Sequence, residues 1–122
     1  VMMCNIVGAV NALKSGKVRG IVVTTANRSS IFPEFPTVQE ITGKPFDVSA
    51  WTGILAPAGT SKDVVDRLNK EIRISLKDQK VQETMQTAGA ELIGSSPEEF
   101  GKFIRDEIKK AQSIVSEKNI KI

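Results

Sequence analysis

The chain has 122 residues, 40% of them hydrophobic, which is enough for the core of one modest domain and leaves little room for a second. Its net charge of +3 comes from basic residues spread along the chain without a run, which argues against a nucleic-acid-binding surface. One cysteine and no histidine exclude an intrachain disulfide and leave no transition-metal ligand set, and no apolar run approaches the roughly 18 residues that cross a bilayer.

The first part of the chain predicts a helix followed by a buried strand. The apolar residues 1–3 are typical of the second half of an internal strand, so we expect the chain to be a piece of a longer protein. Apolar residues at helical spacing predict a short helix over residues 5–17, with Gly16 in the left-handed conformation at its end. Residues 18–25 are β-branched and apolar without alternation, which is typical of a strand covered on both faces of a parallel sheet.

The middle of the chain predicts a proline-rich loop, a short helix and a second long strand. Thr37 and Glu40 have the spacing of a capping box over one or two helical turns. Residues 47–57 form the second apolar strand. The sequence APAGT at residues 56–60 leads from this strand into a helix, and such a turn can bind an anion or simply reverse the chain. Because it lacks the glycines and the Lys-Ser/Thr ending of a phosphate loop, we interpret it as a structural corner.

Two helices and a short strand are predicted next. Thr60 and Asp63 have the spacing of a capping pair before a helix with one apolar face. A second helix follows and is expected to end at Gly89. The sequence AELIG at residues 90–94 predicts a short strand.

The final helix has the clearest start signal in the chain. Ser96 is expected at the N-cap, Pro97 at the first helical position and Glu99 three residues after the cap. We expect its apolar stripe to be buried, and the stripe comprises Phe100, Phe103, Ile104, Ile108, Ala111 and Val115. Strands that alternate with helices predict an α/β domain with a mainly parallel sheet.

Candidate catalytic groups are scarce, since the chain contains neither histidine nor tyrosine. Acidic pairs such as Glu98 and Glu99 lie at the starts or flanks of amphipathic helices, where the helix dipole or solvent explains them. Cys4 has apolar neighbours and no histidine to activate it, so a packed or pocket-lining thiol is the simpler interpretation. The residues therefore indicate no catalytic site, no metal site and no cofactor.

An ordered set of motifs resembles one protein family. In chain order the motifs are GKVRGIVVTT, PTVQE, WTGILAPAGT, AGAE and SSPEEF. Together they look like the C-terminal part of the substrate-binding receptors of tripartite tricarboxylate transporters, the Bug-type periplasmic proteins. The resemblance covers essentially the whole chain, and its specificity comes from the order of the motifs rather than from any one of them.

The resemblance implies a type II periplasmic-binding-protein-like fold with two lobes. Such a receptor closes over a small organic carboxylate and passes it to the permease subunits of a transporter in the membrane, so the chain would not be an enzyme and would lie in the periplasm. Residues 1–46 would form the latter part of lobe two, on the side of the ligand cleft. Residues 47–122 would form the return strand and the C-terminal helices that belong to lobe one.

The resemblance also implies a ligand-binding segment. In the family, the cleft of lobe two often contains Phe-Asp-Asn-x-x-Ser at a helix start, and the matching residues here are MCNIVG at positions 3–8. Asn5 agrees with the motif, whereas Cys4 stands where an acid is common and Gly8 where a small hydroxyl is common. Cys4, Asn5 and Gly8 are the candidate ligand-binding residues, because N–H groups at a helix start suit a carboxylate. Loss of the acid favours a less polar carboxylate as ligand.

Alternatives to this hypothesis remain open. The three candidate residues could pack the top of the sheet without touching a ligand. The chain could also be a protein-interaction module derived from such a receptor, which would bind a permease or a sensor protein without any small ligand. A small enzyme that depends on Cys4 is the third alternative, and thiol alkylation would abolish its activity.

Overall fold

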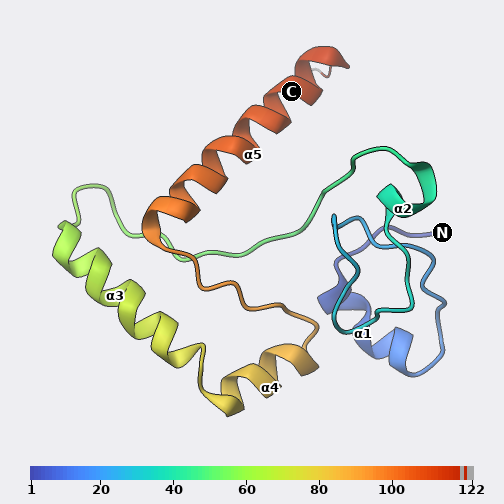
Figure 1. Cartoon of the computed structure of the whole chain (residues 1–122), viewed down its shortest axis with the longest axis horizontal. Helices are drawn as coiled ribbons and strands as arrows, with labels where there is room; N and C mark the ends of the chain where they lie inside the picture. Colours follow the sequence, from blue (N-terminus) through green and yellow to red (C-terminus); the bar gives the residue numbers. More distant parts are fainter. Residues whose placement is uncertain (119, 121–122) are drawn as a thin grey trace. The chain divides into compact units, whose positions relative to one another are not determined.

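The computed structural model describes residues 1–118 and 120, and within them it contains five α-helices and no β-strand (Figure 1). The helices are α1 (Ile6–Lys14), α2 (Val38–Thr42), α3 (Lys62–Ser75), α4 (Gln79–Thr87) and α5 (Pro97–Glu117). The chain divides into two compact units, which are described separately below. Unit 1 comprises Val1–Leu55 and Gln79–Leu92, and unit 2 comprises Ala56–Asp78 and the described residues from Ile93 onward.

In unit 1, α1 forms where helical spacing predicts a helix. Asn5 precedes it with an extended backbone, and its side chain accepts a hydrogen bond from the Val7 N–H at 3.1 Å. Gly16 has φ +69°, which a residue with a Cβ rarely adopts, and the Lys17 N–H bonds to the carbonyl of Ala12 at 3.0 Å. The predicted helix and its glycine end are confirmed, although the helix is shorter than predicted.

The predicted capping box of α2 is confirmed as well. The Glu40 N–H donates to Thr37 Oγ1 at 3.0 Å, and the Thr37 N–H donates back to Glu40 Oε2 at 3.1 Å. Gly43 ends the helix with φ +66°. Thr37 is only 1% exposed, whereas its partner Glu40 is exposed, so these hydrogen bonds are partly buried.

The three predicted strands, residues 18–25, 47–57 and 90–94, are not formed within the described part of the chain. The first segment makes one isolated parallel bridge, between Val23 and Thr37. A strand requires a ladder of successive bonds to a neighbour, and here the pairing stops after one residue. Ile54 and Leu55, which the prediction places in a covered strand, are 75% and 73% exposed. The prediction of a mainly parallel sheet is therefore not confirmed.

A small aromatic cluster forms part of the core of unit 1. Phe32 is 8% exposed and stacks on Phe35, with ring centroids 5.4 Å apart. Gly20 lies directly against the Phe35 ring, because a Cβ added to Gly20 would come within 2.2 Å of Phe35 Cζ. Val10 of α1 is the other buried hydrophobic residue among those described. The glycine is thus required by packing rather than by backbone conformation.

In unit 2, α3 does not begin with the predicted capping pair. The Thr60 hydroxyl donates to the carbonyl of Pro57 at 2.8 Å and so closes the APAGT turn, in which Gly59 has φ +86°. Ser61 is the N-cap residue, and its side chain makes no capping hydrogen bond. The capping pair of Thr60 and Asp63 is wrong because the helix begins one residue later than predicted, with Ser61 at the N-cap and Thr60 outside the helix in the preceding turn.

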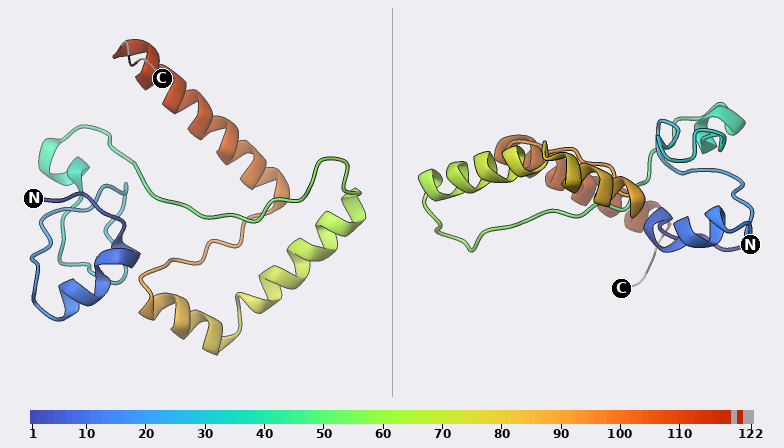
Figure 2. Two further views of the ribbon diagram at one scale, coloured as in Figure 1. Left: turned by 180° about the vertical axis from the view of Figure 1, so that it is seen from behind. Right: turned by 90° about the horizontal axis from the view of Figure 1, so that it is seen from below.

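Helix α5 begins as predicted and contacts α3 (Figure 2). The Glu99 N–H donates to Ser96 Oγ at 3.1 Å, and the Ser96 N–H donates to Glu99 Oε2 at 2.8 Å. Pro97 occupies the first turn. The capping box is therefore confirmed in full.

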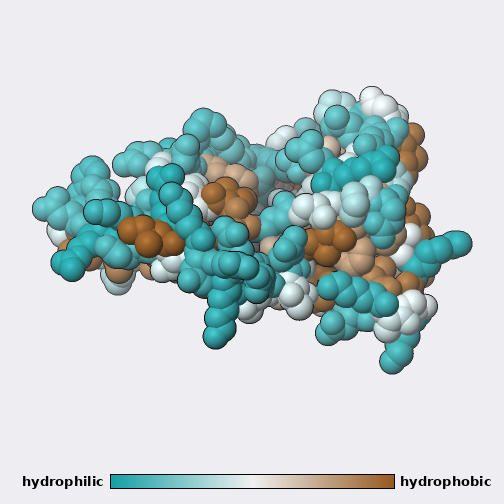
Figure 3. Space-filling model, turned by 60° about the horizontal axis from the view of Figure 1, so that its bottom comes forward, coloured by the Kyte–Doolittle hydropathy of each residue, from teal (hydrophilic) through white to brown (hydrophobic). Residues whose placement is uncertain are grey.

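The predicted burial of the α5 stripe is only partly observed. Phe100 and Phe103 stack with centroids 6.4 Å apart and are half-buried, whereas Ile108 is 51% exposed and Ala111 is exposed. Hydrophobic side chains reach the surface in several places, as the brown regions in Figure 3 show. None of the described helices is both long and apolar enough to cross a membrane.

We predict that Ser96→Ala lowers the free energy of unfolding of unit 2 by about 1 kcal/mol, because the Glu99 N–H loses its side-chain acceptor. Ser61→Ala is the matched control, since Ser61 occupies the N-cap of α3 without a capping bond. Urea unfolding followed by circular dichroism measures both. Equal losses in the two variants would show that the hydroxyl of Ser96 does not stabilise α5.

We predict that Gly20→Ala destabilises unit 1 by about 1–3 kcal/mol, because the new methyl group displaces the Phe35 ring from Phe32. The ring proton shifts of Phe32 and the urea midpoint report the change. Gly8→Ala is the control, since a Cβ there meets no atom within 4 Å and alanine favours the helix. An unchanged stacking signal in Gly20→Ala would contradict the packing role of Gly20.

Candidate functional site

The three predicted ligand-binding residues lie together at the start of α1. Cys4 and Asn5 precede the helix, Gly8 lies in its first turn, and all three are exposed. Cys4 is a free thiol. Within the described structure no atom lies within 4 Å of a Cβ built on Gly8. This side of the first turn is therefore open, and a ligand could approach the backbone there.

Asn5 organises the hydrogen-bond donors of this helix start. Its Oδ1 accepts from the Val7 N–H at 3.1 Å, and its carbonyl accepts from the Gly8 N–H at 3.0 Å. Neither the Ile6 N–H nor the Asn5 side-chain amide donates to any of the described residues. The first turn contains no acidic residue. The partial positive charge of the helix start is thus not cancelled locally, and two donors remain for an anion.

A clamp between Arg28 and Glu40 shapes the loop that follows residues 18–25. The Arg28 Nε lies 3.0 Å from both carboxylate oxygens of Glu40, and its Nη1 donates to the carbonyl of Pro33 at 3.1 Å. Hydrogen bonds from Arg28, followed by that from the Thr37 N–H, lower the pKa of the Glu40 carboxyl, and the same pairing raises the pKa of Arg28. Glu40 therefore caps α2 and anchors the loop at once.

Two further carboxylates hold the same loop. Asp47 Oδ1 accepts from the Ala26 N–H at 3.1 Å. Glu91 Oε1 accepts from the Ser30 N–H at 3.2 Å and from the Ser30 hydroxyl at 2.9 Å. The loop over residues 26–30 is thus fixed from three separate segments of unit 1, by charged acceptors that make stronger hydrogen bonds than neutral ones.

The turn that ends α4 packs against the first turn of α1. Gly89 is buried and has φ +86°, and the Ala90 N–H bonds to the carbonyl of Met85 at 2.9 Å, so the predicted end of this helix is confirmed. A Cβ added to Gly89 would lie 3.5 Å from Val7 Cα. The chain therefore passes directly beside the candidate site before it reaches Glu91.

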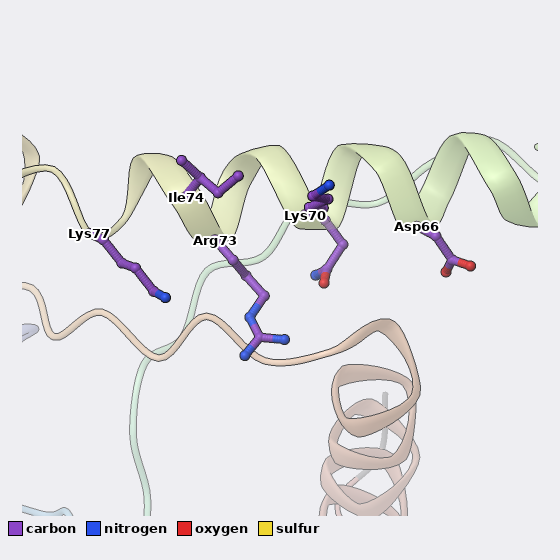
Figure 4. A pocket seen from close by; sticks show the side chains of 6 residues that line it. Asp66, Lys70, Arg73, Ile74 and Lys77 are labelled. Carbon is purple, nitrogen blue, oxygen red and sulfur yellow. The ribbon is translucent and has the colours of Figure 1, made fainter.

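A hollow on α3 does not form a comparable site. It is open, has a volume of about 400 Å³ and is lined by Asp66, Asn69, Lys70, Arg73, Ile74 and Lys77. Arg73 projects towards the segment that leads into α5 (Figure 4). The Asn69 amide donates to the carbonyl of Ser95 at 2.9 Å and so serves packing within unit 2. Exposed basic side chains along an amphipathic helix are what solvation alone produces.

The described residues contain no group of three or more histidine, cysteine or carboxylate side chains that could hold a metal ion. The acidic pair Glu98 and Glu99 lies in the first turn of α5, as solvation and capping require. The start of α1 is therefore kept as the candidate site, because its N–H groups and the helix dipole suit an anion.

Comparison with known proteins identifies relatives over nearly the whole chain. Residues 1–120 match the Tripartite tricarboxylate transporter family receptor. The chain is 35% identical over 102 residues to the UPF0065 protein in the tcbD-tcbE intergenic region of Pseudomonas sp. (strain P51), which covers 83% of this chain and 30% of that protein. It is 30% identical over 118 residues to Protein BugT of Bordetella pertussis, which covers 97% of this chain and 36% of that protein. The chain thus spans about a third of the length of these curated relatives.

Solved structures agree with this placement. The periplasmic binding protein BugD superposes with a TM-score of 0.78 at 32% identity, over 93% of this chain and 38% of BugD. The R. palustris protein Rpa4515, solved with adipate, also has a TM-score of 0.78, at 25% identity, over 91% of this chain and 37% of that one. The fold described above is therefore that of part of a periplasmic binding protein.

We predict that Glu40→Gln makes unit 1 less sensitive to acid. The folded pKa of Glu40 is lowered, so the stabilisation is complete above the unfolded pKa of about 4.3 and is lost as pH falls through the folded value. Urea unfolding between about pH 3 and pH 7 should show a flatter slope below pH 5 for this variant, with lower stability at neutral pH.

Glu34→Gln is the matched control for this measurement, because Glu34 is an exposed glutamate in the same loop region. Its pH profile should follow that of the wild type. If Glu40→Gln kept the full slope of the wild type below pH 5, the clamp would not contribute to acid stability.

Proposed function

The chain belongs to the tripartite tricarboxylate transporter receptor family, and we propose that it serves in an extracytoplasmic receptor that captures a small organic carboxylate for the permease subunits of a transporter. This family consists of solute-binding receptors and is not an enzyme family. Because the chain spans about a third of its curated relatives, the proposal concerns the complete receptor of which this sequence forms a part.

The start of α1 is the observation that carries the proposal. The Ile6 N–H and the Asn5 amide are available donors, the first turn lacks an acid, and the surface beside Gly8 is open. A helix start of this kind stabilises a carboxylate through its N–H groups and through the helix dipole. We propose Cys4, Asn5 and Gly8 as ligand-facing residues on this basis.

A less polar carboxylate fits this segment best. Neither Cys4 nor Gly8 offers a charged partner for an ammonium group or several hydroxyl groups on a ligand. The structure of the related Rpa4515 is described with adipate, which is a carboxylate of this kind. Adipate is therefore a suitable first probe for the receptor proposed here.

The exposed apolar residues support the proposal that other parts of a larger receptor pack against this chain. Ile54, Leu55 and Leu68 are 75%, 73% and 52% exposed, and burial of such side chains provides most of the driving force for packing. We propose that residues 1–46 belong to lobe two and residues 47–122 to lobe one of the receptor, and that the remaining sequence of the receptor covers these side chains. A periplasmic location follows from the same proposal.

We predict that Gly8→Asp weakens binding of the carboxylate by about 1–3 kcal/mol, because it places a like charge beside the bound anion. Isothermal titration calorimetry of the complete receptor with adipate measures the loss. Gly8→Asn is the matched control, since it adds a side chain of the same shape without the charge, and it should lose less affinity.

Circular dichroism of both variants should match the wild type, because a side chain at Gly8 meets no described atom within 4 Å. Wild-type affinity in Gly8→Asp with an intact fold would remove this segment from the binding site. A complete receptor that binds the permease but no small carboxylate would favour the interaction module instead.

A further inference from the structure

Residues 88–91 connect two parts of unit 1, the first turn of α1 and the loop around Ser30. Gly89 packs against the first turn of α1, and Glu91 accepts two hydrogen bonds from Ser30. Only Ala90 separates these two contacts along the chain. An extended pair of peptide units spans at most about 7 Å, so the segment fixes how far the loop around Ser30 can lie from the start of α1.

Two donors of one residue bond to a single carboxylate oxygen of Glu91. Its Oε1 receives both the Ser30 N–H at 3.2 Å and the Ser30 hydroxyl at 2.9 Å, across 61 positions of sequence. The preceding Ser29 Oγ accepts from the Ile31 N–H at 3.2 Å, which orders the turn internally. The Ser29 hydroxyl keeps its own proton to donate, because it acts as acceptor in that bond.

Gly89 lies beside the first turn of α1, where a Cβ would make ordinary van der Waals contacts. Gly89 is buried, and a Cβ there would lie 3.5 Å from Val7 Cα and 3.6 Å from both the Ile6 carbonyl oxygen and the Val7 nitrogen. On its other side the turn is tied to α4 through the bond from the Ala90 N–H to the Met85 carbonyl. A movement of this turn would therefore act on the first turn of α1, where the proposed ligand donors lie.

We propose that Glu91 is a positioning residue for carboxylate binding, which holds the Ser29–Ser30 turn at a fixed distance from the donors at the start of α1. The inference rests on the function proposed above. Glu91 does not contact the ligand, because its charge would repel a carboxylate, and its Oε1 is already engaged by Ser30. Glu91 acts on ligand affinity indirectly, by fixing the Ser29–Ser30 turn relative to the start of α1.

The variants Glu91→Ala and Glu91→Gln separate this role from a general effect of charge. Alanine removes the acceptor for both Ser30 donors, whereas glutamine keeps a side-chain carbonyl oxygen in the same place and removes the charge. Glu83→Ala is the matched control, since Glu83 is an exposed glutamate of the same unit that accepts from Gln79 within α4.

The first measurement needs no ligand and uses the chain as it is. In Glu91→Ala we expect amide exchange of Ser30 to become about tenfold faster, because a bond to a charged acceptor is lost, and we expect the NMR shifts of the Val7 and Gly8 amides to change. Glu91→Gln and Glu83→Ala should leave both signals near wild type. A change confined to Ser30 would overturn the inference, because Glu91 would then hold the loop alone.

The second measurement is a titration of the complete receptor with adipate. We expect Glu91→Ala to weaken binding about fivefold, Glu91→Gln to bind like the wild type or more tightly, and Glu83→Ala to bind like the wild type. Equal affinity of Glu91→Ala and wild type overturns the positioning role and leaves the proposed function intact. If the wild type binds neither adipate nor other small carboxylates, the proposed function fails, while the amide measurement still decides whether Glu91 positions the start of α1.

Discussion

Hydrogen bonds at Val23 and Thr24 join three segments of unit 1, and the pairing of Val23 with Thr37 is parallel. The Val23 N–H donates to the Pro36 carbonyl at 2.9 Å, and the Val23 carbonyl accepts from the Val38 N–H at 3.0 Å. On the other side, the Thr24 carbonyl accepts from the Val48 N–H at 2.9 Å, and the Thr24 hydroxyl donates to the Val48 carbonyl at 2.7 Å. One stretch of chain thus joins two others, and the capped helix α2 and the clamped loop begin from this junction.

This constraint explains which predictions from sequence succeed. A capping box needs only four consecutive residues, and those of Thr37 with Glu40 and Ser96 with Glu99 are both present. The glycine ends at Gly16 and Gly89 are equally local. Thr60 is the local failure, because it lies in the turn that precedes the helix and the N-cap position falls on the next residue, Ser61. Strands and buried stripes depend instead on what covers them, and the described chain does not cover residues 47–57.

The candidate site was predictable to the same extent. The helix start at Asn5 follows from residue type and spacing, whereas a ligand-binding role for Cys4 and Gly8 comes only from the resemblance to receptors. The contacts of Arg28 and Glu91 had no sequence signal, because their partners lie 12 and 61 positions away. From sequence alone, a charged residue in a loop is predicted to be solvated unless its partner is known. The structure therefore adds the hydrogen bonds that order the loop over residues 26–30, which no local pattern predicts.

The hydrogen bonds of the loop over residues 26–30 also affect the electrostatics of unit 1. An anion at the start of α1 would be repelled by nearby carboxylates that lack donors, and the loop over residues 26–30 draws in Glu40, Asp47 and Glu91. Each of them accepts a hydrogen bond from that loop, and for Glu40 the bonds from Arg28 and from the Thr37 N–H lower the pKa of the carboxyl. The first turn of α1 meanwhile contains no acid of its own. The carboxylates that order the loop are thus held by its donors, so the loop and the carboxylate site proposed at the start of α1 use separate hydrogen bonds.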